Sequence, residues 1–206
     1  TKFLLFVFCM VMARSIIVVS KHLKNRYRLF GKWANQNFII IPVSVSCPPS
    51  SSDDCEKSGN KNVILTVTNL DYKGKLKGVK KAVNGVFEVL ADQPHTVYVI
   101  AGGGKYYQDL TSYINTNSPS EDIRNRIHAT GHVDDVSSLY HESDVFVYFS
   151  YEDGYPNVVL EAMSYGLPIV TNNAVGMSEQ ITNNKSGIFV DENDPKIIQD
   201  QLISLL

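Results

Sequence analysis

The sequence is poor in the residues that mark special classes of protein. Of its 206 residues, 3 are cysteine, 8 are proline and 13 are glycine, whereas 44% are hydrophobic. Fibrous, low-complexity and disordered chains are thereby excluded, because enough apolar residues are present to build a core. Nineteen basic residues against 21 acidic ones give a net charge of −2. We therefore expect no nucleic-acid partner, and any polyanion that binds should be small and held at a local site.

The few cysteines exclude a further class. Cys9, Cys47 and Cys55 are an odd number and form no C-x-x-C pair, which argues against a disulfide framework and against a structural zinc site. Three free thiols in a reducing compartment are expected. A bridge between Cys47 and Cys55, across a proline-rich loop, is the alternative.

Long hydrophobic runs are also missing, apart from FLLFVFCMVMA at residues 3–13. This run is too short to cross a bilayer, which needs about 20 apolar residues. We expect a buried helix; a membrane-contacting helix and the core of a signal peptide that follows Lys2 are the alternatives. The chain opens on Thr1 and stops at QLISLL within a helical pattern, which we interpret as a piece of a longer protein.

Short apolar runs alternate with longer amphipathic ones along the rest of the chain. Strands are expected at residues 16–20 and 38–45, with a basic helix between them that ends near Gly31. Residues 46–61 are rich in Ser, Pro and Asp and have no apolar period, as expected of a linker or surface loop. Further strands, separated by helices, are expected at residues 63–67, 95–101, 126–130, 145–149, 168–171 and 187–190.

Strands that are apolar on both faces and alternate with helices predict an α/β fold with a Rossmann-like, doubly wound parallel sheet from about residue 62. Ligands bind such sheets where the carboxyl ends of the strands lead into helices. We therefore expect the functional residues in the strand-to-helix loops.

The first of these loops is NLDYKGKLKG, residues 69–78, which carries Lys73, Lys75 and Lys77. A helix is expected to start near Lys77, and its free N–H groups and dipole favour an anion. The loop therefore predicts phosphate binding. A solvated lysine-rich loop is the alternative.

The second loop is AGGGK, residues 101–105. Gly102 and Gly103 allow either the close approach of a ligand to the backbone or a tight turn. The loop has neither the G-x-G-x-x-G spacing of a dinucleotide site nor that of a P-loop. Both interpretations stay open.

The third loop is GHVDD, residues 131–135. His132 has a side chain that titrates near neutral pH, and Asp134 is placed to cap the next helix. Judged by itself, a single histidine in a loop is more often structural than functional, so we expect a structural role.

The fourth loop, SYEDGYPNVVLEAMSYGLPIV at residues 150–170, is the most informative. A helix is expected from Asn157, and Glu161 lies one turn into it on the apolar side. A carboxylate there is costly unless it finds hydrogen-bond donors, and it suits the hydroxyls of a sugar or ribose. Glu152 and Asp153 suit the same task, but for Glu152 a position favoured by the helix dipole is the alternative.

The segment DGYPNVVLEAMSYGLPIV resembles the acidic motif of retaining glycosyltransferases of family 4, which have the GT-B fold. The usual form of that motif is E-G-[FY]-x-N-x-x-x-E-A-M-A-x-G-x-P-[VI]-[VI]. Counted back from Glu161, the first acidic position holds Asp153, which is shorter than the usual glutamate. Either Asp153 serves in its place or Glu152 reaches in from the next position.

The resemblance covers nearly the whole chain. SIIVVSKHLK is similar to the end of the family's N-terminal domain, and NFIIIPVSVS to the strand that crosses into the C-terminal domain. It implies a remnant of the N-terminal domain at residues 1–45, a linker at 46–61 and a nucleotide-sugar-binding domain at 62–206. The family has an arginine where Asn69 stands here, so the charge on the donor diphosphate must come from Lys77 first and Lys75 second.

The resemblance further implies transfer of a hexose, with retention, from a UDP- or GDP-sugar to a saccharide or lipid-linked acceptor. Glu161 would hold the ribose, Asp153 the transferred sugar, and the turn from Gly154 to Asn157 would present N–H groups. No cofactor is implied, and no D-x-D or histidine cluster suggests a metal. The site residues implied are Asp153, Glu161 and Lys77 for catalysis and Lys75, Gly102, Gly103, Gly131, His132, Val133, Glu152, Gly154, Tyr155, Pro156 and Asn157 for binding.

Three further expectations follow from the resemblance. The protein is expected in the cytoplasm, with peripheral contact at the inner membrane face left open. Its partners would be the nucleotide sugar, the acceptor and the missing N-terminal domain. A sugar-nucleotide-binding module without activity and a GT-B epimerase or phosphorylase are the alternatives, because a fold alone does not determine a reaction.

Overall fold

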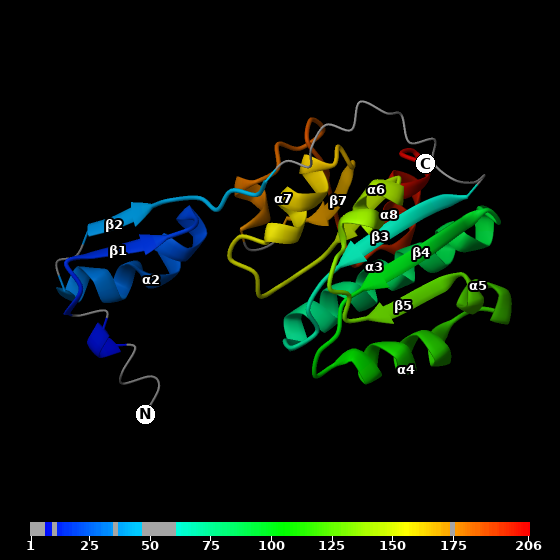
Figure 1. Cartoon of the computed structure of the whole chain (residues 1–206), viewed down its shortest axis with the longest axis horizontal. Helices are drawn as coiled ribbons and strands as arrows, with labels where there is room; N and C mark the ends of the chain where they lie inside the picture. Colours follow the sequence, from blue (N-terminus) through cyan, green and yellow to red (C-terminus); the bar gives the residue numbers. More distant parts are fainter. Residues whose placement is uncertain (1–6, 10–11, 35–36, 47–60, 174–175) are drawn as a thin grey trace.

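The computed structural model describes residues 7–9, 12–34, 37–46, 61–173 and 176–206. Two parallel sheets make up its framework (Figure 1). The smaller sheet pairs β1 (Ser15–Val18) with β2 (Asn37–Ile40), and α2 (Lys21–Ala34) connects the two strands. The second strand is shorter than expected, because it ends at Ile40 rather than at residue 45.

The larger sheet has six strands in the order β5-β4-β3-β6-β7-β8, and every neighbouring pair is parallel. This order confirms the predicted doubly wound α/β fold. The strands are β3 (Asn62–Val67), β4 (Thr96–Ala101), β5 (Ile127–Gly131), β6 (Val145–Tyr148), β7 (Ile169–Asn172) and β8 (Ile188–Val190). The helices are α3 (Lys73–Asp92), α4 (Tyr107–Asn117), α5 (Glu121–Asn125), α6 (Ser137–Glu142), α7 (Asn157–Ser164), the 3-10 helix η1 (Met177–Glu179) and α8 (Pro195–Ile203).

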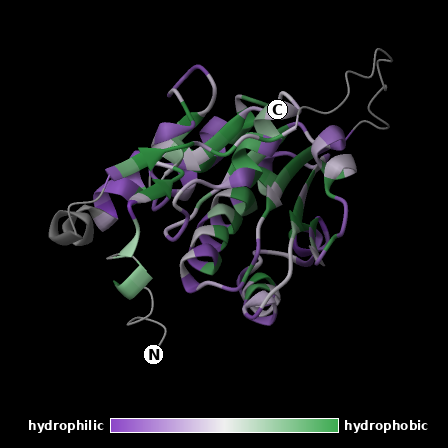
Figure 2. Ribbon diagram, turned by 60° about the vertical axis from the view of Figure 1, so that its left-hand side comes forward, coloured by the Kyte–Doolittle hydropathy of each residue, from purple (hydrophilic) through white to green (hydrophobic). Residues whose placement is uncertain are grey.

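Each face of the six-stranded sheet has its own hydrophobic core. Val145 and Val147 of β6 face α3, α4 and α8, whereas Phe146 and Tyr148 face α6, α7 and η1. The strands therefore need apolar side chains on both faces, as the sequence predicted. Figure 2 shows hydrophobic residues concentrated on these strands and hydrophilic ones on the outer sides of the helices.

The chain reverses its direction of winding between β3 and β6. From β3 it proceeds to β4 and then β5 at one edge, and it returns to β6 on the other side of β3. The loops after β3 and β6 consequently separate toward opposite faces of the sheet. A crevice at their carboxyl ends is the usual binding position in this class of fold.

Several details differ from the sequence-based expectations. The helix after β3 begins at Lys73 rather than near Lys77, and the short helix α5 was not predicted. In the opening run, Phe8 and Met12 are 60% and 68% exposed, so the described part of the run is not buried in this chain. Cys9 is an exposed free thiol, and Cys47 and Cys55 lie outside the described residues. No helix in the described part of the chain is long and apolar enough to cross a membrane.

Candidate active site

A cavity of about 290 Å³ opens at the carboxyl ends of β3 and β6, which is the point where the winding reverses. Its walls come from the end of β3, the first turn of α3, the end of β6 and the start of α7. Two of the loops singled out in the sequence, the lysine-rich loop and the acidic loop, contribute to these walls. The residues that line the cavity are Thr68, Asn69, Lys75, Tyr148, Asp153, Tyr155, Pro156, Asn157 and Val158.

Asp153 is the acidic side chain of this cavity. Its Oδ2 accepts hydrogen bonds from the hydroxyls of Tyr148 and Ser150, the latter at 2.9 Å. Its Oδ1 lies 3.2 Å from Nζ of Lys75, and the two side chains of this ion pair are 19% and 15% exposed. Asp153 is thus turned toward the carboxyl end of β6, with a cation and two hydroxyls around it.

Lys75 reaches Asp153 because α3 starts early. A start at Lys73 places Lys75 in the first turn of the helix, where the helix dipole favours negative charge. A phosphate in the cavity would meet both the ammonium group and this helix end.

Glu161 lies one turn beyond Asn157 and therefore on the same side of α7. It is half-buried rather than fully buried, which corrects the sequence-based expectation, and it does not line the cavity. Its Oε2 accepts a hydrogen bond of 2.9 Å from the hydroxyl of Tyr140. The donor that the sequence required for this carboxylate is thus a tyrosine of α6.

Both tyrosines next to the acids stay protonated at neutral pH. Burial and the Asp153 carboxylate raise the pKa of Tyr148 well above its ordinary value, and the hydroxyls of Ser150 and Thr68 only partly oppose this. Burial and the Glu161 carboxylate likewise raise the pKa of Tyr140. Each hydroxyl therefore keeps its proton and donates a hydrogen bond to the neighbouring carboxylate.

Glu152 has a different position. Its side chain is directed to the start of α3, where Oε2 accepts the N–H of Gly74 at 2.9 Å. A Cβ on residue 74 would lie 2.4 Å from Cγ of Glu152, so the glycine makes room for this contact. Glu152 thus lies at a helix N-terminus, as the alternative had it, but at that of α3 and not of α7. It does not line the cavity.

Lys77 also lies outside the cavity. Its Nζ lies 4.2 Å from the centre of the Tyr151 ring, and it lines a groove between α3 and α4 together with Lys73 and Lys80. The sequence ranked Lys77 ahead of Lys75 for the diphosphate, but the structure places Lys75 beside Asp153.

The glycine loop after β4 joins two strand ends. At Gly102 φ is +140°, and a Cβ there would lie 1.5 Å from the carbonyl oxygen of Thr68. The N–H of Leu70 donates to the carbonyl of Gly103 at 2.8 Å. These contacts support the tight-turn interpretation, and neither Gly102 nor Gly103 lines the cavity.

The loop after β5 is open to solvent and does not line the cavity either. His132 is exposed and its Nε2 lies 3.2 Å from Oδ1 of Asp134. Asp135, not Asp134, accepts the N–H of Ser137 at the start of α6. The Ser137 hydroxyl and, second to it, this N–H hold the pKa of the Asp135 carboxyl below its ordinary value. Gly131 has φ +74° beside the Tyr107 ring, and half-buried Val133 packs on the α6 and α7 core.

The acidic turn is held from the outside by two other segments. At Gly154 a Cβ would lie 2.8 Å from the side chain of Leu23 of α2, so Leu23 would have to shift to admit one. Nε2 of Gln180 donates to the carbonyl of Pro156 at 3.0 Å. The turn from Gly154 to Asn157 therefore depends on α2 and on the segment after η1, both remote from it in sequence.

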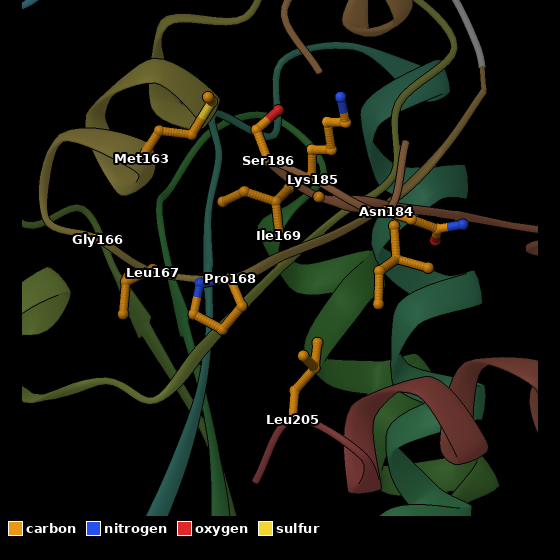
Figure 3. A pocket seen from close by; sticks show the side chains of 11 residues that line it. Met163, Gly166, Leu167, Pro168, Ile169, Asn184, Lys185, Ser186 and Leu205 are labelled. Atoms are coloured by element: carbon orange, nitrogen blue, oxygen red, sulfur yellow. The ribbon is translucent and has the colours of Figure 1, made fainter. Parts of the chain in front are cut away.

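A larger cavity, of about 530 Å³, lies at the other end of the sheet (Figure 3). It is formed by the segments that lead into β7 and β8, including Pro168 and Lys185. None of the described residues that line it is a carboxylate, and all the candidate acids lie at the opposite strand ends. Its size therefore does not make it the better candidate. Within the described ranges, moreover, no group of three or more His, Cys, Asp or Glu side chains could hold a metal ion.

Tyr148, Tyr140 and Ser150 are the hydrogen-bond donors to the two acids that sequence reasoning missed, and Thr68 and Val158 are lining residues that it missed. The two tyrosines stand in segments that were interpreted only as a strand and a helix. A buried tyrosine needs a partner for its hydroxyl, and Tyr148 follows three apolar residues at the carboxyl end of a strand. That combination was the available signal.

Comparison with known proteins adds evidence of ancestry. The family model described as Glycosyl transferases group 1 matches residues 61–206. The capsular polysaccharide biosynthesis glycosyltransferase CapM of Staphylococcus aureus is 23% identical over 210 residues, which cover 96% of this chain and 53% of CapM. A UDP-Gal:alpha-D-GlcNAc-diphosphoundecaprenol alpha-1,3-galactosyltransferase of Escherichia coli is 33% identical over 101 residues, or 49% of this chain and 25% of that enzyme.

A solved structure supports the fold. The Anabaena protein HepE, in complex with UDP and glucose, superimposes with a TM-score of 0.78 at 17% identity and covers 95% of this chain and 54% of that protein. The chain thus spans about half the length, or less, of the relatives described here.

Proposed function

The chain belongs to the glycosyl transferases group 1 family, and from this premise we propose that it binds a nucleotide-diphosphate sugar at the Asp153 cavity and transfers the hexose with retention of configuration. The observation that carries the proposal is the ion pair of Lys75 and Asp153 at the reversal point of the sheet. A cation for the diphosphate and a carboxylate for sugar hydroxyls are the two groups that such a donor needs.

The leaving group determines the role of Lys75. Departure of a nucleoside diphosphate develops negative charge, which a preorganised cation and a helix N-terminus stabilise most where water is excluded. Lys75 lies in the first turn of α3 and is 15% exposed. When the donor binds, Lys75 would leave its ion pair with Asp153 and pair with the phosphate instead. Lys77 would lie further from the diphosphate than Lys75 does.

Each of the two carboxylates would bind a different part of the donor. We assign Asp153 to the hydroxyls of the transferred sugar and Glu161, further along α7, to the ribose. Gly154, Tyr155, Pro156 and Asn157 bring the start of α7, with its free N–H groups, to the same cavity. A short-lived oxocarbenium-like state between diphosphate and acceptor would then give retention.

The substrates proposed are taken from the chemistry of the site and the names of the relatives. The Escherichia coli relative is named for a UDP-sugar and a lipid-diphosphate acceptor, and CapM for capsular polysaccharide. We therefore propose a UDP-sugar as donor, with a GDP-sugar as the alternative, and a saccharide or lipid-linked acceptor in glycan synthesis. Work at the cytoplasmic face of a membrane, with a further N-terminal domain as partner, belongs to the same proposal.

Removal of each acid tests the assignment. We expect Glu161→Ala to abolish binding of the donor, and Asp153→Ala to weaken it by about tenfold or more, because a hydrogen bond to a charged group contributes about 1.5–3 kcal/mol. Glu152→Ala should weaken donor binding less than Asp153→Ala does, since the Glu152 carboxylate already accepts the N–H of Gly74. Calorimetry with UDP-glucose, UDP-galactose, UDP-N-acetylglucosamine and GDP-mannose measures this order.

Glu142→Ala is the matched control, because Glu142 is an exposed carboxylate at the end of neighbouring α6. Its donor affinity should equal that of the wild type. Equal binding by the wild type and the Glu161 variant would overturn the site assignment. Product analysis tests the reaction, and an epimerised free sugar formed without acceptor would contradict a transferase.

A further inference from the structure

Two buried tyrosine hydroxyls contact the two candidate acids, one each. Tyr148 donates to Asp153, and Tyr140 donates to Glu161. The rings of both tyrosines belong to the same core, beside α6 and α7. A tyrosine hydroxyl on a rigid, packed ring is a donor with a defined direction, because the ring leaves only two side-chain torsions to position it.

Tyr148 is 1% exposed and is the last residue of β6. Its ring stacks on Phe146 with 6.1 Å between ring centres, and its carbonyl accepts the hydroxyl of Thr171 at 2.6 Å. Backbone and ring are therefore both fixed, and the hydroxyl defines where Oδ2 of Asp153 lies.

This anchoring leaves room at the other carboxylate oxygen. A carboxylate has about four acceptor positions. Tyr148 and Ser150 occupy the two at Oδ2, and Lys75 approaches Oδ1. When Lys75 turns to a phosphate, Oδ1 becomes the oxygen that accepts hydroxyls of the sugar.

Tyr140 is 2% exposed and has an equivalent relation to Glu161. Its ring stacks on that of Tyr165 at 5.4 Å and contacts Phe146 at 5.9 Å between ring centres. The hydroxyl donates to Oε2 at 2.9 Å, which leaves Oε1 for a ligand. Because Glu161 has a longer side chain than Asp153, it has more torsions that need such a restraint.

We propose that Tyr148 and Tyr140 are positioning residues that orient the two acids separately, Tyr148 for the transferred sugar and Tyr140 for the ribose. This inference rests on the proposed function, because it uses the division of the donor between Asp153 and Glu161. It assigns the two tyrosines distinct contributions to donor affinity, which a purely structural role in the core would not produce.

The experiment separates the sugar from the nucleotide. Calorimetry on the whole 206-residue chain measures the affinity for the tightest-binding member of the four nucleotide sugars named above and for the matching free UDP or GDP. The variants are Tyr148→Phe and Tyr140→Phe. The matched control is Tyr98→Phe, since Tyr98 is also fully buried but its hydroxyl bonds to Thr66 on the other face of the sheet. Thermal unfolding verifies that each variant is folded.

We expect Tyr148→Phe to weaken binding of the nucleotide sugar by about tenfold and to leave binding of the free diphosphate unchanged. Tyr140→Phe should weaken both ligands equally, by about tenfold, because ribose is common to both. Tyr98→Phe should alter neither.

Three results would overturn the inference. If Tyr148→Phe and Tyr140→Phe bind both ligands as the wild type does, the tyrosines do not position the acids. If they change both affinities only as much as Tyr98→Phe, their role is structural. If the wild type binds none of the four nucleotide sugars, the proposed function itself is wrong, and the inference is wrong with it.

Discussion

At the scale of single residues, the site combines partners that are close in the sequence, Tyr148 and Ser150 for Asp153, with partners that lie far away. Asp153 pairs with Lys75, 78 positions before it, and Glu161 is bonded by Tyr140 of another helix. The acids themselves are recognisable from the motif, but their remote partners Lys75 and Tyr140 are not, because a carboxylate in a sequence does not identify its partner. Lys75 rather than Lys77 is the neighbour of Asp153 for the same reason.

Gly102 provides a test at this scale. We expect Gly102→Ala to lower the free energy of unfolding by more than about 3 kcal/mol, since backbone strain at φ +140° adds to a clash with the Thr68 carbonyl. Gly166→Ala is the control: φ is +75°, but a Cβ would meet no atom within 4 Å, so about 1 kcal/mol is expected. Urea unfolding measures both. Equal losses would contradict a backbone contact between the strand ends.

At the scale of elements, two helix starts determine the geometry of the site. The first is that of α3, which begins at Lys73, before the position that the sequence suggested. Glu152 supplies an acceptor for the N–H of Gly74 and so allows the additional turn. The earlier start moves Lys75 from a loop into the helix and next to Asp153.

The second helix start is that of α2. The backbone N–H groups of its first turn donate to acceptors that include a side chain from the end of η1. Glu179 accepts the N–H groups of Lys21 and His22 at 2.7 and 2.6 Å, and Oγ of Ser20 accepts that of Leu23 at 3.1 Å. This end of α2 also packs Leu23 against Gly154 in the acidic turn. Glu179 therefore holds α2 against the turn that carries Asp153.

Loss of this cap should loosen α2 selectively. We expect Glu179→Ala to speed amide hydrogen exchange in α2 by about tenfold, because two N–H groups lose their acceptor and a cap contributes about 1 kcal/mol. Helix α8, which is capped by its own Asp194, is the internal control and should exchange as before. Unchanged exchange in α2 would show that Glu179 does not stabilise its docking.

At the scale of the whole molecule, two cores enclose the sheet, and three fully or nearly fully buried tyrosines lie in them. Tyr98, Tyr140 and Tyr148 are 0%, 2% and 1% exposed. Burial raises the pKa of all three above 10 in the folded state. Their hydroxyls are therefore expected to be neutral throughout the range in which the protein is folded.

This burial predicts a stability that falls in alkali. Above pH 10 the unfolded chain releases the tyrosine protons whereas the folded chain retains them, so the free energy of unfolding falls as the pH rises. Below pH 10 the tyrosines are protonated in both the folded and the unfolded chain, so the free energy of unfolding keeps its full value with respect to these groups. Each tyrosine should lower stability by up to about 1.4 kcal/mol per pH unit above that value. Denaturant unfolding between pH 8 and 12 measures the slope, which should be shallower in Tyr98→Phe; an identical slope would contradict the assignment.

The sequence by itself determined the α/β class, the parallel winding, the order of strands and helices and the position of the acidic turn. These follow from local patterns: apolar runs on both faces of a strand, helical periodicity, and a motif of fixed spacing. The residues at which strands end, the short helix α5 and the start of α3 were less predictable. They depend on contacts such as that of Glu152 with Gly74.

Only the tertiary structure decided which polar groups meet. It brought Lys75 of α3 to Asp153 after β6, set Tyr148 and Tyr140 beside the two acids, and directed Glu152 and Lys77 away from the cavity. The physical reason is that parallel strands place their carboxyl ends at one edge whatever their separation in sequence. Partners at that edge are chosen by packing and by the need of every buried polar group for a hydrogen bond, and neither is written in any short stretch of sequence.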